Sequence, residues 1–137
     1  MTSQLSTAVR NARADAIEST IGTSPILEIW SGTKPSDCSS ADAGDGSVLA
    51  TLNLDSDWLA AATGGTKSKS GTWEDLSADA NGTATHFRIK DSGGSTCHWQ
   101  GTVTVTGGGG DMEVDNTSIA LGQQITVTTF TWTEGNG

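Results

Sequence analysis

Residues 101–116, GTVTVTGGGGDMEVDN, place a run of glycines directly after an alternation of valine and threonine. A glycine-rich loop after a strand can hold phosphate on its backbone amides, but the Walker loop also needs a lysine and a following helix. Here Gly110 is followed by Asp111, Met112 and Glu113, whose carboxylates would repel phosphate, and the segment then alternates as a strand does. We therefore expect a hairpin connection in which glycine supplies positive φ values, with no nucleotide and no other cofactor.

Cys38, Cys97, His86 and His98 are the residues that could ligate a transition metal or form a nucleophile–base pair. A structural zinc site takes four ligands, but His98 directly follows Cys97, and adjacent residues of a strand point to opposite faces. We therefore expect no metal site and no Cys97–His86 dyad. The two cysteines could form a disulfide. The first residues contain no apolar signal segment, so we expect synthesis in a cytosol and therefore reduced thiols at first.

Acidic residues are numerous, and the stretches DAGDG and DSD are similar to calcium-binding loops. Neither stretch has the alternating oxygen ladder with a distal glutamate, so caps, turns and solvated loops explain them better, and surface calcium binding stays open. Carboxylates that are remote in sequence could still pair as in glycosidases. No G-x-S-x-G elbow is present, and no acidic residue has a distinctive apolar setting. We expect no catalytic residue and no enzymatic activity.

The chain has five tryptophans, which could form a sugar-stacking platform. Such residues more often fill a small core or an interface. A carbohydrate-binding module therefore remains an alternative, and exposed coplanar rings would favour it.

The composition limits the possible partners. The chain has 137 residues, enough for one domain with its own core, and carries 7 basic and 16 acidic residues for a net charge of −9. Binding to nucleic acid or to an anionic membrane requires a basic face, so neither partner is expected. No apolar run approaches the ~20 residues that span a bilayer.

The spacing of apolar residues predicts a helix over 5–21, capped by Ser3 or Ser6 and closed by Gly22. Its charged residues fall mostly on the opposite side. The apolar stripe is thin, so we expect it to dock on a sheet or on a neighbouring subunit. The stripe consists of Leu5, Val9, Ala12, Ala16 and Ile17. Within it, Leu5, Val9 and Ile17 are the candidate assembly-interface residues.

After Pro25 the period changes to two, with turn signals spaced as in antiparallel sandwiches. The fold class is therefore mainly β: an antiparallel β-sandwich, with a jelly roll as one candidate arrangement, and one N-terminal α-helix. The expected organisation is a helical arm at 1–24 and a β-sandwich domain at 25–137. We expect a polar loop at 34–47 and a short helix at 55–63.

Basic residues in two segments are expected to face water. Lys67 and Lys69 lie in a flexible turn or edge segment, where charge discourages unwanted strand pairing. Residues 83–91 alternate, with His86, Arg88 and Lys90 on one face and Phe87 and Ile89 on the other. This pattern predicts one wet face and one buried face.

Taken whole, the sequence resembles a family of small virion structural proteins of tailed bacteriophages and prophages. The resemblance rests on four stretches that together run through nearly the full chain: STAVRNARADAIESTIGTSPILEIWSG, SVLATLNLDSDWLAAA, GTATHFRIKDSGG and GTVTVTGGGGDMEVDNTSIALGQQITVT. It implies a particle protein assembled in the bacterial cytoplasm and located in the virion, and it transfers no catalytic residue.

Such a protein is expected to be a capsid decoration or cement protein that binds the outer capsid surface and stabilises the head. Its expected partners are the major capsid protein and copies of itself, because many weak contacts on a lattice add up to avidity. The alternatives are a structural protein of the tail, neck or baseplate, and a carbohydrate- or host-receptor-binding β-sandwich module.

Overall fold

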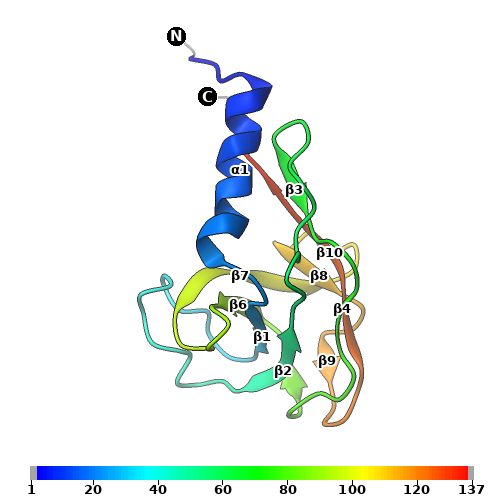
Figure 1. Cartoon of the computed structure of the whole chain (residues 1–137). Helices are drawn as coiled ribbons and strands as arrows, with labels where there is room; N and C mark the ends of the chain where they lie inside the picture. The colour runs from blue at the N-terminus through cyan, green and yellow to red at the C-terminus, as the bar shows by residue number, and fades with distance from the viewer. Residues whose placement is uncertain (1–2, 136–137) are drawn as a thin grey trace.

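The computed structural model describes residues 3–135 (Figure 1). The chain begins with one helix, α1 (Thr7–Ile21), and continues with short strands. The strands are β1 (Ile26–Trp30), β2 (Val48–Asn53), β3 (Thr66–Ser68), β4 (Trp73–Asp75), β5 (Gly82–Thr83), β6 (His86–Lys90), β7 (Cys97–Val105), β8 (Met112–Val114), β9 (Ser118–Ile119) and β10 (Ile125–Thr133). The prediction of a mainly β, sandwich-like fold with one N-terminal helix is confirmed.

Most strands join one curled sheet in the order β2-β1-β6-β7-β8-β10-β3, with β4 also paired to β10 and β5 paired to β9. All these pairs are antiparallel except β7 with β8, which run parallel. In Figure 1, α1 projects from one pole of the β-structure and lies beside β3 and the end of β10.

The glycine run therefore does not form the hairpin that we expected, because a hairpin would make β7 and β8 antiparallel. The chain turns after Val105 and runs back beside β7 before β8 begins, with the Gly110 amide donating to Thr104 Oγ1 at 2.9 Å. Gly107 and Gly109 have positive φ values of 88° and 81°. A Cβ on Gly108 or Gly110 would lie 2.7–2.8 Å from Thr104. Glycine is thus needed both for backbone conformation and for space.

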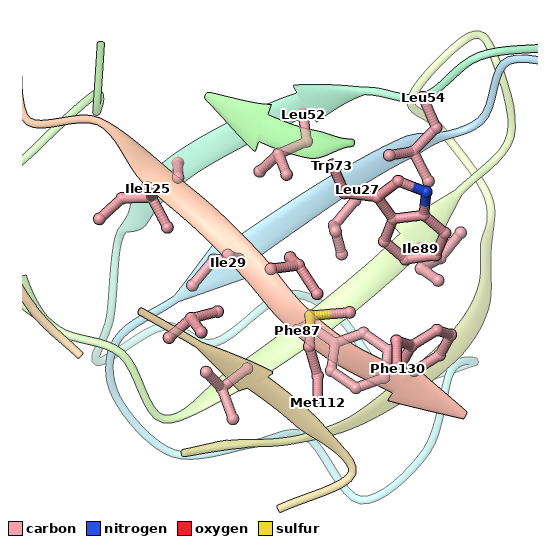
Figure 2. Packing of buried hydrophobic residues seen from close by; sticks show 14 of the residues in the cluster. Leu27, Ile29, Leu52, Leu54, Trp73, Phe87, Ile89, Met112, Ile125 and Phe130 are labelled. Atoms are coloured by element: carbon pink, nitrogen blue, oxygen red, sulfur yellow. The ribbon is translucent and has the colours of Figure 1, made fainter. Parts of the chain in front are cut away.

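The core lies inside the curled sheet (Figure 2). Alternate residues of β1, β2, β6 and β10 point into it, as the two-residue period predicts. Trp58 and Trp73 are buried and contact each other, and Trp73 also contacts Phe130. Two of the tryptophans thus fill the core.

The helix predicted at 55–63 is absent. The backbone pairs instead with the end of β3 and the residues after it, since the Ser70 amide donates to the Trp58 carbonyl and the Ala60 amide to the Ser68 carbonyl. Leu59 and Trp58 are still buried anchors. Tertiary pairing has overridden local helix propensity. Residues 59–65, which we name the irregular segment, contain several N–H groups that need acceptors.

Candidate functional site

The helix α1 docks on the body of the protein through a face that combines buried apolar residues, Ala14 and Ile21, with polar side chains. Ser6 caps its first turn, and Gly22 ends it with φ 94°. Three side chains on one face accept hydrogen bonds from backbone N–H groups of the irregular segment: Asn11 from Gly65 at 2.7 Å, Asp15 from Ala62 at 2.9 Å and Glu18 from Leu59 at 3.0 Å. The helix thereby satisfies the amides that this segment leaves unpaired.

Lys67 reaches under the same face. It is 2% exposed, and its ammonium lies 2.7 Å from Asp15, 3.1 Å from Glu18 and 2.8 Å from the Ala60 carbonyl. Burial alone would lower the pKa of Lys67, but hydrogen bonds and the charges of Asp15 and Glu18 raise it above its ordinary value. The exposed edge lysine that we expected is instead the charged centre of the helix contact.

Polar docking turns much of the predicted apolar stripe outward. Val9 is 45% exposed, and Ala12 and Ala16 are exposed as well. Ile17 packs against the core, and Leu5 is half-buried. The candidate interface residues are therefore not on one surface: Val9 faces solvent and Ile17 faces the protein. The expectation that the charged side of the helix faces outward is wrong, since alanine stripes bury little area while unpaired amides need acceptors.

The same helix is tied to the end of β10. Arg10 donates to the Glu134 carbonyl at 3.1 Å and to the Gly64 carbonyl at 3.3 Å. Arg13 forms an ion pair with the Glu134 carboxylate at 3.2 Å, although its side chain is 55% exposed. Segments from opposite ends of the sequence therefore hold each other at one pole.

A second polar cluster lies on the outer side of β6. All five residues of β6 are buried, including His86, Arg88 and Lys90, so the predicted wet face is wrong. Residues 31–47, which we name the covering loop, lie over this side and supply its partners. The two-residue period predicted that His86, Arg88 and Lys90 share one side of the strand, but it carried no signal that a distant loop would cover them.

The Arg88 side chain holds the covering loop mainly through the backbone carbonyls of the loop. Its guanidinium pairs with Asp42 and also donates to the carbonyls of Asp37, Cys38 and Ser40 at 3.0–3.2 Å. A planar guanidinium presents several donors in fixed directions, which suits a curved run of carbonyls.

Lys90 completes the cluster beside Arg88. Its ammonium lies 2.9 Å from both Glu28 and Asp42, and 5.9 Å from the centre of the Trp30 ring. Burial alone would lower the pKa of Lys90, but its two carboxylate partners raise it. Burial alone would raise the pKa of Asp42, but Lys90 and Arg88 lower it. The buried charges are therefore compensated, with two cations facing two carboxylates.

His86 is fully buried and stacks on Trp30, with ring centres 6.1 Å apart. Thr85 Oγ1 lies 2.6 Å from the Gly32 carbonyl, to which it donates, so Nδ1 of His86 must donate to Thr85 Oγ1 at 2.9 Å. The other ring nitrogen, Nε2, has no hydrogen-bond partner among the described residues. Burial and the charge of Arg88 lower the pKa of His86, which favours the neutral ring.

Cys38 and Cys97 form a disulfide that joins the middle of the covering loop to the start of β7. Both cysteines are half-buried. Because they are bonded to each other, the expectation of reduced thiols is wrong, and Cys97 is not available for a dyad with His86. A surface cavity of about 300 Å³ lies beside the bond, lined in part by Asp42, Arg88 and Lys90.

Two tryptophans meet at a smaller notch. Trp99 and Trp132 lie edge to face, with ring centres 5.7 Å apart and planes at 88°, beside Asp111 and Phe130. The notch has a volume of about 110 Å³, and Trp132 is 40% exposed. The rings are not coplanar, so they do not form the flat stacking platform that would favour a glycan-binding module.

Comparison with protein-family models, with curated protein sequences and with solved structures finds no match. Within residues 3–135, no group of three or more histidine, cysteine or acidic side chains is arranged to hold a metal ion. The described helix is not long and apolar enough to cross a membrane.

Proposed function

We propose that the chain is a structural protein of a tailed-bacteriophage virion that decorates the outer capsid surface and stabilises the head. The observation that carries the proposal is the outward apolar stripe of α1. The helix already uses its polar face to dock, so Val9, Ala12 and Ala16 remain available for contact with another protein.

Three further features support this role. The sequence resembles phage virion proteins, and the fold is a small β-domain with a net charge of −9. The buried charged clusters sit under the helix and under the covering loop, where they hold surface segments in place. An acidic domain with an exposed apolar stripe suits lattice binding, because repeated weak contacts give avidity.

The test is incorporation into particles. Val9→Asp places a charge on an exposed position, so we expect the free protein to keep its stability within about 0.5 kcal/mol. We expect its incorporation into particles to fall clearly, because a charge in an apolar contact is costly when the contact is dry. Ser92→Asp, at an exposed turn away from α1, is the matched control and should be incorporated normally.

Equal incorporation of the Val9→Asp protein and the wild type would mean that the stripe is not the contact. A particle map that places the protein in the tail, neck or baseplate would reject the head location. Unchanged heat stability of particles without the gene would reject the stabilising role. A carbohydrate-binding module is the weaker candidate because Trp99 and Trp132 are perpendicular, and binding to a glycan array would support it.

A further inference from the structure

The covering loop has no hydrophobic anchor. No residue between 31 and 47 is fully buried, whereas the strands on both sides of it contribute Trp30 and Leu49 to the buried set. The hydrophobic effect, which is the main favourable term in folding, therefore contributes little to holding this loop down. Its closure depends on polar contacts and on one covalent bond.

The polar contacts beneath the loop pair buried cations with carboxylates. Arg88 and Lys90 are 2% and 6% exposed, and each is paired with Asp42. Bringing such charges out of water carries a desolvation penalty that can equal or exceed their mutual attraction. Opening the loop would return hydration to these cations, so the ion pairs alone do not ensure closure.

The disulfide is placed to decide between the closed and open loop. Cys38 lies near the middle of the covering loop and Cys97 belongs to β7, and their Cα atoms are 5.1 Å apart. Both side chains are half-buried and line the 300 Å³ surface cavity, so a small thiol can approach the bond. An accessible disulfide is one that exchanges with solution thiols.

We propose that the Cys38–Cys97 bond is a redox latch that keeps the covering loop closed over Arg88 and Lys90, and that reduction of the bond opens the loop. To close the latch, one cysteine thiolate attacks a low-molecular-weight disulfide and releases one small thiol. The other cysteine then attacks the mixed disulfide and releases the second. The two thiol protons and two electrons lost by the protein end on the two released thiols. Opening is the reverse reaction.

The latch changes the charge of one surface. In the closed state, Arg88 and Lys90 are hidden in a protein whose net charge is −9. In the open state, the loop carries Asp37, Asp42 and Asp45 away, which leaves Arg88 without its carboxylate partner and Lys90 with Glu28 alone. The inference concerns the chain itself and does not depend on the proposed virion role.

Amine labelling can test the latch because the chain contains its own control. Lys90 is buried under the covering loop, and Lys67 is buried under α1, at 6% and 2% exposure. The full chain is treated with an acetylating ester, with and without dithiothreitol, and each lysine is followed by peptide mass spectrometry. We expect reduction to raise the labelling rate of Lys90 about tenfold or more while Lys67 stays protected, because opening is local.

The Cys38→Ser/Cys97→Ser protein should label Lys90 rapidly with or without dithiothreitol. Adding oxidised glutathione to the reduced wild type should restore protection of Lys90 and leave no mixed disulfide. Unchanged protection of Lys90 after reduction would overturn the proposal, since the loop would then close without the bond. Equal gains at Lys90 and Lys67 would also overturn it, because the bond would then stabilise the whole fold.

Discussion

At the scale of single residues, His86 is a buried base without a partner on Nε2 among the described residues. Its pKa is lowered from 6.5 in the folded protein, so below about pH 6.5 the unfolded chain takes up a proton that the folded chain refuses. Stability contributed by this residue is therefore complete above that pH and is lost as the pH falls towards the lower folded pKa. The carboxylates of Asp37 and Asp42 do not add to this change, because their pKa values are lowered from 3.8.

We therefore expect the free energy of unfolding to fall between about pH 7.5 and pH 5.5. His86→Asn removes the titrating ring and should flatten this dependence, whatever it does to stability at pH 7.5. His98 is exposed, so His98→Gln is the control and should keep the wild-type slope. Denaturant unfolding at several pH values measures how the free energy of unfolding depends on pH. Identical slopes for His86→Asn and the wild type would contradict the attribution of this dependence to His86.

Sequence periodicity predicts which apolar residues of the strands are buried, but it does not predict whether the cationic residues on the opposite side are buried or exposed. The alternation at 86–90 places Phe87 and Ile89 inward, as observed. It also places Arg88 outward, where an open face was expected, and only the three-dimensional return of a loop distant in sequence buries it. Burial of such a residue depends on pairing with a remote carboxylate, for which a two-residue period carries no signal.

At the scale of elements, the contact between α1 and the irregular segment depends on Lys67 and its two carboxylates. Lys67→Met leaves Asp15 and Glu18 partly solvated and still bonded to backbone amides, so we expect a loss of about 1–3 kcal/mol. The double change Asp15→Asn/Glu18→Gln instead leaves a buried ammonium without a counter-charge. We expect this loss to be larger, about 3–5 kcal/mol.

Chemical unfolding of the wild type, the Lys67→Met protein and the Asp15→Asn/Glu18→Gln protein measures which change lowers the free energy of unfolding more. Lys69→Met is the matched control, because within residues 3–135 the Lys69 ammonium donates to the Gly71 carbonyl and has no ion pair, and it should change stability by less than about 0.5 kcal/mol. If Lys67→Met proves to be the more damaging change, packing of the lysine stem, and not the buried charge, governs the helix contact.

Elements with a strong local signal could be predicted, and elements that depend on tertiary pairing could not. The helix and both of its caps follow from the sequence, as do the long strands. The orientation of α1 does not, because the amides that Asn11, Asp15 and Glu18 satisfy belong to residues 59–65, most of which were expected to lie in a helix at 55–63 and the rest in a flexible turn. The parallel pairing of β7 with β8 likewise depends on the path of a glycine loop, which composition alone leaves open.

At the scale of the whole molecule, α1 and the β-structure are expected to unfold together. The helix is bonded to residues 59–65 and, through Arg10 and Arg13, to Glu134. Its loss would leave backbone amides unpaired and Lys67 without its carboxylate partners, so a folded β-structure without the helix is unfavourable. We expect one calorimetric transition, with calorimetric and van't Hoff enthalpies in agreement.

Following the far-ultraviolet helix signal and the near-ultraviolet tryptophan signal through the same melt provides a second measure. Coincident curves are the expected result. A helix signal lost at a clearly lower temperature would show that residues 1–24 behave as a separate arm, as the division at residue 24 first suggested.

Arg88 binds carbonyl oxygens of the covering loop, and every amino acid supplies the same carbonyl. The contact is therefore indifferent to the identity of an outward side chain such as Ala41, which is exposed. Mutations at this position would leave the contact with Arg88 intact, so the loop can change there while Cys38, Asp42 and Arg88 stay constant. The covering loop is therefore where new surface chemistry can arise, or be selected from a library, without a new fold.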